Sequence, residues 1–343
     1  MLRDALQATG SVTAIDSGQH YDYAMHAVHY DQLGILPSDV YLGVGSGSHA
    51  EQTSAILAAA ARYLVEQPPD LVVVIGDTNT TLACALAAAK MRIPVAHVEA
   101  GMRARDHMMA EEINRRCVDA FSSLLFAPSA TAERALHEEG LGGLISRVGD
   151  VAYDVLCRFS EKAPGLGDLP LFQPNMGDGY IFATLHRAEL VDDTDRLRAV
   201  ITSLARLSMP VVFAAHPRTA AAIKKLGIDL SGHLRVVGPV GYLESLTLTR
   251  NARVAVTDSG GLQREAYWLG VPCVTVREET EWTETVNLGA NRLVSPSSTE
   301  LLDGAIEAAS CSGKDWDRGA YGDGTAGLRI ASEARRFLAG HRQ

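Results

Sequence analysis

The sequence predicts an α/β fold with two domains, each built on a parallel β-sheet. Short apolar segments alternate with segments of helical periodicity along most of the chain. The alternation stops once, at the glycine- and proline-rich stretch Lys162–Pro174, and then resumes. Polar residues directly follow several of the apolar segments, and ligands of parallel sheets bind outside the carboxyl ends of the strands. These observations predict two similar domains that carry a site at their strand ends.

In the first half, the clearest strand is the β-branched run Leu71–Ile75, which is typical of a central strand buried on both faces. The glycine-rich loop Gly43–Ser48 precedes a helix and has two interpretations, a flexible loop or a phosphate cradle. The other strands are expected at Ser11–Ile15, Pro94–His97 and Leu124–Ala127. Helices are expected at Met1–Thr9, Tyr23–Leu33, Gln52–Val65, Thr80–Lys90 and Thr131–Glu139, around Glu111–Arg116, and from Asp150 to about Ser160.

The second half repeats the same pattern after the linker. Its strands are expected at Tyr180–Thr184, Pro210–Ala214, Leu234–Val237, Arg253–Val256 and Cys273–Val276. Its helices are expected at Asp193–Leu207, Tyr242–Asn251 and Ala326–Leu338, and one begins near Gly260. The predicted domains are therefore residues 1–161 and 175–325, with a final helix within 326–343.

Composition limits the function classes. The chain has 343 residues, 47% of them hydrophobic, which is enough for two buried cores. Its net charge of −10 argues against nucleic acid and anionic membranes as partners, because both would repel an acidic surface. The five cysteines are scattered without a Cys-x-x-Cys pair, as expected of reduced thiols in a cytoplasmic protein. No apolar run could span a membrane, and no histidine spacing predicts a metal site.

The stretch Thr257–Ala266 has the sequence of an anion site, because a strand turns through Ser-Gly-Gly into a helix. Unpaired amides at a helix start and the helix dipole attract phosphate, and glycines allow its close approach. Glu265 lies about one and a half turns further on, within reach of a ribose attached to that phosphate. The alternative is a structural helix that Ser259 caps with its side chain. The candidate binding residues here are Ser259, Gly260, Gly261 and Glu265.

Further polar residues near strand ends are candidates for chemistry: Asp77, Glu99, Glu111, His186 and His216. Carboxylates beside a diphosphate site suit proton transfer at a sugar whose leaving group is a nucleotide. Each residue also has a structural interpretation, as a helix cap, a first-turn carboxylate, a salt-bridge partner or a hydrogen-bonded loop histidine. The chain lacks a G-x-S-x-G elbow, a Walker A motif and a well-placed G-x-G-x-x-G, so serine hydrolysis and phosphoryl transfer from ATP are poorly supported.

A set of motifs spread over nearly the whole chain resembles the UDP-N-acetylglucosamine 2-epimerase family, in particular its archaeal-like, non-hydrolysing branch. So many motifs in one order make a chance similarity implausible. The loops GQHYDY (Gly18–Tyr23) and GVGSGSHAEQT (Gly43–Thr53) also resemble that branch. The main motifs are GDTNTTLA (Gly76–Ala83), HVEAGMR (His97–Arg103), EEINR (Glu111–Arg115), LHRAEL (Leu185–Leu190), HPRT (His216–Thr219), TDSGGLQREA (Thr257–Ala266), TEW (Thr280–Trp282) and YGDG (Tyr321–Gly324).

The resemblance implies a GT-B architecture: two Rossmann-like domains, a cleft between them, and a C-terminal helix that packs back on the first domain. It implies that a homodimer interconverts UDP-GlcNAc and UDP-ManNAc without a cofactor, by eliminating UDP to 2-acetamidoglucal and adding it back. By motif match, Asp77, Glu99 and Glu111 would be the proton-transfer carboxylates, assisted by His186. The substrate contacts would be Ser259, Gly260 and Gly261 at the diphosphate, Glu265 at the ribose, and Arg115 and His216.

The sequence also departs from the family pattern. Family members begin with an apolar strand ending in Gly-Thr-Arg-Pro-Glu, which has no counterpart before Met1. We therefore expect the first sheet to be without a central strand and the protein to be poorly active, or its start to be placed too late. Smaller departures are Ala110, where proline is usual, and the sequence Ala188–Leu190.

Three alternatives remain open from the sequence. A hydrolysing 2-epimerase would release free ManNAc and UDP from the same intermediate. A GT-B glycosyltransferase would transfer the sugar to an acceptor instead. An inactive binder of sugar nucleotides would keep the fold without the chemistry.

Overall fold

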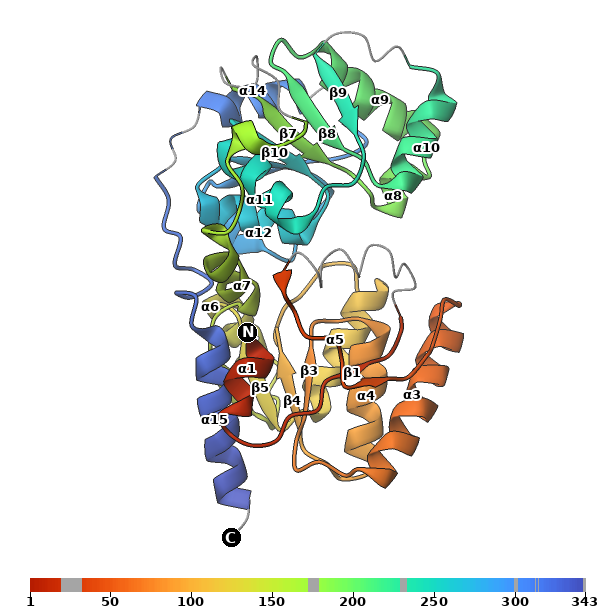
Figure 1. The fold of residues 1–343 in the computed structure, drawn as a ribbon, viewed down its shortest axis with the longest axis vertical. Coiled ribbons are helices and arrows are strands. Elements are labelled where there is room, and N and C mark those ends of the chain that lie inside the picture. The colour runs from red at the N-terminus through yellow and green to blue at the C-terminus, as the bar shows by residue number, and fades with distance from the viewer. Residues whose placement is uncertain are drawn as a thin grey trace. The chain divides into compact units, whose positions relative to one another are not determined.

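The structure is a computed structural model that describes residues 1–19, 33–171, 179–228, 233–298, 302–311, 313 and 315–341. The chain divides into two compact units (Figure 1). The first unit is Met1–Arg158 together with Gly319–Gln343, and the second is Phe159–Arg318. The helix predicted at Tyr23–Leu33 lies outside the described residues, apart from its last residue. In the described part of the chain, no helix combines the length and the apolar character needed to span a bilayer.

The first unit contains a parallel sheet with the strand order β3-β4-β5-β6. β4 and β5 are buried along their whole length, which explains their apolar sequences. The register pairs Ile75 with Val98, so the residues that follow β3 and β4 leave the sheet next to each other. The strands are β3 (Val72–Ile75), β4 (Val95–Val98), β5 (Leu124–Ala127) and β6 (Leu144–Arg147).

Helices follow these strands in chain order: α4 (Asn79–Lys90), α5 (Ala110–Phe121), α6 (Ala130–Glu138) and α7 (Val151–Ser160). Upstream, β1 (Ile15–Asp16) and β2 (Val40–Tyr41) form a separate two-stranded sheet. The next helix is α3 (His49–Glu66), which packs against α4. It begins at His49, before the predicted Gln52, because Ser48 and Glu51 form a capping box. The Gly43–Ser48 loop thus ends in a helix cap.

The last helix of the chain, α15 (Ala326–His341), belongs to the first unit and lies beside α1 (Leu2–Gln7) (Figure 1). Its N-terminus is capped by the buried carboxylate of Asp154 on α7, which accepts hydrogen bonds from the amides of Ala326 and Gly327 at 3.0 and 2.7 Å. Ile330 and Phe337 of this helix join the core formed by the strands of the first sheet.

The second unit contains a six-stranded parallel sheet with the order β12-β11-β10-β7-β8-β9. From β7 (Ile181–Thr184) the chain first builds outward to β8 (Val211–Ala214) and β9 (Leu234–Val237). It then returns to the other side of β7 with β10 (Val254–Thr257), β11 (Cys273–Val276) and β12 (Asn291–Val294). The strand order therefore reverses between β7 and β10. This switch point is where doubly wound sheets bind ligands, outside the carboxyl ends of the strands.

Helices connect these strands and enclose the sheet with two apolar clusters. They are α8 (Ala188–Val191), α9 (Thr194–Arg206), α10 (Pro217–Leu226), α11 (Tyr242–Asn251), α12 (Gly260–Leu269), α13 (Thr283–Asn287) and α14 (Leu302–Cys311), with the 3₁₀ turn η1 (Leu166–Asp168) in the linker. Most predicted strands and helices lie within a few residues of the observed ones. The sequence analysis did not predict β6 and β12, which are edge strands with two polar and two apolar residues each rather than continuous apolar runs.

Candidate functional site

At the switch point of the second unit, Asp258 holds the loop that carries His186. Asp258 follows β10 and is almost completely buried. Its carboxylate accepts hydrogen bonds from the backbone amides of His186 and Arg187, at 2.9 and 2.8 Å. It also lies 3.2 Å from His186 Nδ1, while the imidazole itself is 48% exposed. A buried carboxylate therefore fixes the loop after β7 and leaves the histidine ring accessible at the strand ends.

Next to Asp258, α12 begins with the predicted Ser-Gly-Gly sequence. Ser259 occupies the N-cap position, but its side chain makes no capping hydrogen bond. The alternative in which the Ser259 hydroxyl caps the helix is therefore wrong. The first-turn amides receive no side-chain cap and the helix dipole adds to their positive potential, which is the arrangement of an anion site.

The two glycines of this turn meet different surroundings. A Cβ at Gly260 would lie 2.8 Å from Nε1 of Trp282, so the indole requires glycine there. A Cβ at Gly261 would meet only the Ser259 hydroxyl, at 3.6 Å. Open space at Gly261 is consistent with a ligand that approaches the backbone. The sequence analysis attributed both glycines to phosphate approach, and the indole contact at Gly260 is an additional reason.

Glu265 lies on α12 among largely buried neighbours. Burial raises the pKa of its carboxyl to about 7, even though the nearby Arg264 works in the opposite direction. The Arg264 guanidinium stacks over the Trp282 ring at 3.9 Å from its centroid. Arg277 and Glu281 form a largely buried ion pair at 3.0 Å in the segment that leads to Trp282. These contacts fix the segment that lies against the start of α12.

His216 follows β8, the neighbour of β7, and occupies the N-cap position of α10. Its Nδ1 accepts a hydrogen bond from the amide of Arg218 at 3.3 Å. The side chain is exposed. His186 and His216 therefore follow adjacent strands at the same edge of the sheet.

In the first unit, Asp77 and Glu99 come together at the ends of two paired strands. The amide of Gly76 donates to the carbonyl of Val98 at 3.0 Å. An Oε atom of Glu99 lies 3.7 Å from the position that a Cβ at Gly76 would occupy. Glu99 has φ = 69°, a left-handed conformation that is strained for a residue with a side chain. Such strain clusters at active sites and ligand clamps, so Glu99 is a strong site candidate.

The two glutamates at the start of α5 have opposite surroundings. Glu112 is fully buried, and its carboxylate accepts from the Ala104 amide at 2.9 Å and pairs with Arg115 and Arg116. Glu111 is half-buried, and its carboxylate makes no hydrogen bond or ion pair with the residues that the structure describes. Arg115 also pairs with Asp77, and so links α5 to the end of β3. Of these two glutamates, Glu111 is therefore the one whose carboxylate is available for a substrate.

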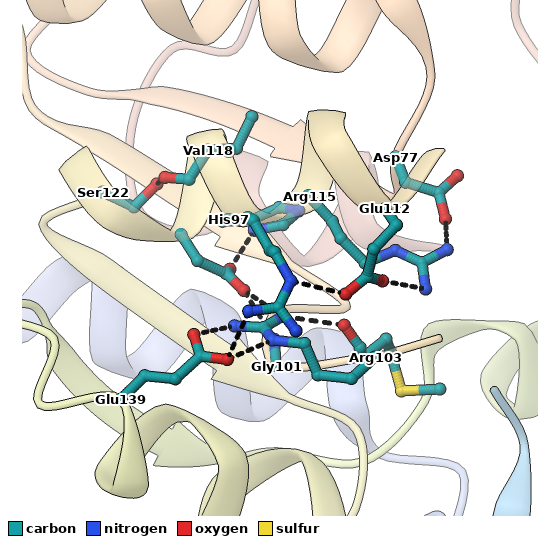
Figure 2. Close-up of polar contacts among 12 residues, drawn as sticks. Asp77, His97, Gly101, Arg103, Glu112, Arg115, Val118, Ser122 and Glu139 are labelled. Atoms are coloured by element: carbon teal, nitrogen blue, oxygen red, sulfur yellow. Dashed lines mark hydrogen bonds and ion pairs between the residues drawn. The ribbon is translucent and has the colours of Figure 1, made fainter. Parts of the chain in front are cut away.

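These contacts belong to an unbroken series of paired side chains that begins at His97 and then alternates between carboxylates and guanidinium groups (Figure 2). Burial opposes ionisation of Arg103, but the carboxylates of Glu139 and Asp119 raise the pKa of its guanidinium. The hydrogen bond from Arg103 in turn lowers the pKa of Glu139. In order, the series is His97, Asp119, Arg103, Glu139, Arg116, Glu112, Arg115 and Asp77.

The structure thus groups the predicted site residues in two sets. Asp77, Glu99 and Arg115 lie together in the first unit, with Glu111 on the same helix as Arg115. The second unit groups His186, His216 and the start of α12. The sequence analysis placed Asp258 at a strand end but assigned no role to it, and it did not single out His97 or the ion pairs between Asp119 and Arg116. The signal for His97 was a histidine inside an otherwise apolar strand. No cluster that could ligate a metal occurs among the described residues.

The sequence model of one family, described as UDP-N-acetylglucosamine 2-epimerase, matches residues 4–334. A Pseudomonas aeruginosa protein named UDP-2,3-diacetamido-2,3-dideoxy-D-glucuronate 2-epimerase is 40% identical over 95% of this chain and 91% of its own length. A Methanocaldococcus jannaschii protein named UDP-N-acetylglucosamine 2-epimerase is 39% identical over 92% of this chain and 89% of its own.

Among solved structures, the M. jannaschii UDP-GlcNAc 2-epimerase in complex with UDP-GlcNAc and UDP matches with a TM-score of 0.88 at 37% identity. The match covers 98% of this chain and 95% of that one. This confirms the predicted α/β class and GT-B architecture.

Proposed function

Because this chain belongs to the UDP-N-acetylglucosamine 2-epimerase family, we propose that it inverts C2 of UDP-GlcNAc to form UDP-ManNAc. The observation that carries the proposal is the family match over residues 4–334, together with carboxylates at the strand ends of the first unit. The reaction needs no redox cofactor, since it proceeds by elimination and re-addition of UDP. The result is an isomerase that acts on a nucleotide sugar.

The chemistry explains why carboxylates are needed beside an anion site. The C2 hydrogen of the sugar is not acidic, so cleavage of the C1–O bond must run ahead of proton removal. UDP leaves with the electrons of that bond, a carboxylate takes the C2 proton, and 2-acetamidoglucal forms. Protonation of C2 from the opposite face and attack of UDP on C1 then give the epimer. We assign the proton transfers to Asp77, Glu99 and Glu111.

The second unit would hold the nucleotide. Ser259, Gly260 and Gly261 would hold the diphosphate, whose negative charge grows as UDP departs, and the amides of Gly260 and Gly261 receive no side-chain cap from Ser259. Glu265 lies further along the same helix, where its carboxylate would accept hydrogen bonds from the ribose hydroxyls. His186 would assist near the diphosphate, with its loop fixed by Asp258. His216 and Arg115 would be further substrate contacts.

The test is incubation of the purified protein with UDP-GlcNAc in D₂O, followed by proton NMR. UDP-ManNAc with deuterium at C2 is the expected product. Free ManNAc and UDP would instead identify the hydrolysing reaction. Absence of C2 exchange would contradict epimerase activity and leave a glycosyltransferase or a sugar-nucleotide binder.

A second substrate is favoured by one observation, the 40% identity to the P. aeruginosa 2-epimerase whose name gives a diacetamido glucuronate sugar. That sugar would use the same C2 chemistry on a substrate with a carboxylate at C6. The same exchange assay with UDP-2,3-diacetamido-2,3-dideoxy-D-glucuronate decides between the two. The substrate with the higher kcat/KM is the physiological class.

The setting of the enzyme is also part of the proposal. We place it in the cytoplasm as a homodimer that supplies a polysaccharide pathway. The five cysteines are unpaired thiols, which fits a reducing compartment. Light scattering of the purified protein tests the dimer, since a monomer would have the chain mass of 36.6 kDa.

A further inference from the structure

The two ends of the ion-pair series hold two consecutive residues of the first unit, Gly76 and Asp77. At one end, Nε2 of His97 lies 2.9 Å from the carbonyl oxygen of Gly76. At the other end, Arg115 pairs with the carboxylate of Asp77, the next residue along the chain (Figure 2). Asn114 of α5 donates to the carbonyl of Asp77 at 2.8 Å. The turn that presents Asp77 is therefore held both from β4 and from α5.

His97 is fully buried, and both of its ring nitrogens face hydrogen-bond acceptors. A peptide carbonyl can only accept, so Nε2 must carry a proton for Gly76. Nδ1 lies 2.6 Å from Oδ1 of Asp119. The charge on the imidazole therefore depends on whether Asp119 is ionised.

The contacts of Asp119 are those of a carboxylate. Its Oδ2 accepts from the amide of Gly101 at 3.1 Å and from Arg103 at 2.7 Å. Burial alone would raise the pKa of Asp119, but His97 and Arg103 hold it below its usual value. An ionised carboxylate only accepts hydrogen bonds, so Nδ1 of His97 also donates. The buried imidazole then carries both protons and a positive charge.

We propose that His97 is a positioning residue of the epimerase reaction, a buried imidazolium that holds the turn of Asp77 through Gly76 and the turn of Glu99 through Asp119. The inference rests on the proposed function, because it assumes that Asp77 and Glu99 act on the substrate. His97 itself contacts the Gly76 carbonyl and Asp119, and acts through them.

The geometry at Glu99 explains why positioning is required. Glu99 has the strained left-handed φ of 69°, which persists only where the surroundings enforce it. The Ala100 amide donates to the Phe126 carbonyl at 3.1 Å, and the Gly101 amide donates to Asp119. The imidazolium fixes Asp119, so it stabilises the turn that aims Glu99. A displacement of about 1 Å in such a group lowers the rate about 10²-fold.

The first experiment compares wild type with His97→Gln. Glutamine can donate to the Gly76 carbonyl but carries no charge and cannot also reach Asp119. We expect kcat for C2 exchange to fall about 10²-fold, while KM changes less than about threefold. UDP binding should stay unchanged, because the residues that we assign to the diphosphate and the ribose lie in the second unit. Tryptophan fluorescence can measure it, since all three tryptophans, Trp268, Trp282 and Trp316, also lie in that unit.

Two further measurements separate positioning from general stability. Asp154→Asn changes another buried carboxylate of the same unit, whose hydrogen bonds to described residues go to the start of α15 rather than to either turn. We expect this control to lower the melting temperature without changing kcat well below it. If His97→Gln behaves like this control, with a lower melting temperature and wild-type kcat, the proposal is wrong.

The charge of His97 can be measured without any assay of activity. ¹⁵N NMR of the histidine-labelled wild-type protein should show both ring nitrogens of His97 protonated at pH 7.5. An unprotonated Nδ1 or Nε2 would overturn the proposal even if the variant is inactive. Conversely, wild-type protein without C2 exchange would refute the proposed function, and the NMR result would still decide the state of the imidazole.

Discussion

The two units carry different kinds of polar groups at their strand ends: paired side chains in the first and backbone amides in the second. In the first unit, Asp77 sits at the end of a long series of charged side chains, each paired with the next. In the second unit, backbone amides form the candidate anion site, and a single buried carboxylate, Asp258, orders the loop of His186. The first arrangement fixes charges in space, whereas the second leaves amide donors open.

The difference matches the two tasks of the proposed reaction. Proton transfer at carbon depends on the orientation of a few carboxylates, which side-chain pairing can set within a fraction of an ångström. Holding a diphosphate requires donors that are not already used, which a helix start provides. Charge placement should therefore depend on side chains of the first unit, and UDP binding on the second.

We expect the largest effects from substitution of the adjacent Glu111 and Glu112, one on the rate and the other on stability. Glu111→Gln removes the carboxylate that is available for a substrate, and we expect kcat to fall about 10²- to 10⁴-fold with little change in melting temperature. Glu112→Gln breaks a buried pair with Arg115 and should lower the free energy of unfolding by about 3–5 kcal/mol. Steady-state kinetics and urea unfolding measure both. Equal behaviour of the two variants would remove the distinction between them.

In the second unit, Asp258→Asn should act on stability and ligand binding together. A carboxamide oxygen in the place of Oδ2 could still accept from the amides of His186 and Arg187, but an NH₂ donor would replace Oδ1 beside the His186 amide. The acceptor lost there costs about 1–3 kcal/mol. UDP affinity by calorimetry should fall with it. The matched control is Asp192→Asn, which alters an exposed ion pair with Arg218 and should change stability by less than about 0.5 kcal/mol. A stable Asp258→Asn protein with normal UDP affinity would contradict the assignment.

Substitution of the two glycines at the start of α12 should separate an effect on stability from an effect on UDP binding. Gly260→Ala places a Cβ 2.8 Å from the Trp282 indole, and should lower the free energy of unfolding by about 1–3 kcal/mol. Gly261→Ala meets open space and should leave thermal stability near wild type while weakening UDP binding. Unfolding curves with and without UDP measure both the stability and the UDP affinity of each variant. Wild-type UDP affinity in Gly261→Ala would show that phosphate does not approach this backbone.

The smallest effect concerns the pH dependence of UDP binding. Glu265, with a pKa of about 7, is mostly protonated at pH 6 and mostly ionised at pH 8, so UDP affinity should rise about tenfold over that range. The stability of the free protein should change in the opposite direction. The folded state favours the protonated form, so the free energy of unfolding falls as pH rises from about 4.5 to 7.

Glu265→Gln is the control for both trends. Glutamine does not ionise, so its contribution to UDP affinity and to stability should not vary between pH 6 and 8. Calorimetric titrations and melting curves at both pH values make the comparison. A variant that retains the full wild-type pH dependence would assign the titration to another group.

The sequence predicted the central strands and the strand-end positions of Asp77, Glu99, His186 and Asp258 because apolar runs and the residues after them are local signals. It did not predict β6 and β12, where edge strands lack a continuous apolar run. The ion-pair series was also out of reach. Arg103 lies in the loop after β4, and Glu139 lies 36 residues further on, at the end of α6, so no pattern within a short window contains their pairing.

The place of α15 in the fold determines which unit can finish folding first during translation. The second unit, Phe159–Arg318, leaves the ribosome before Gly319–Gln343, which completes the first. Ile330 and Phe337 of α15 are part of the first unit's core, so that core cannot be completed until α15 has been translated. The unit that begins first thus finishes last. Until α15 is made, the apolar side chains that it covers, among them Ala96 and Phe126, form a surface that a chaperone of nascent chains could bind.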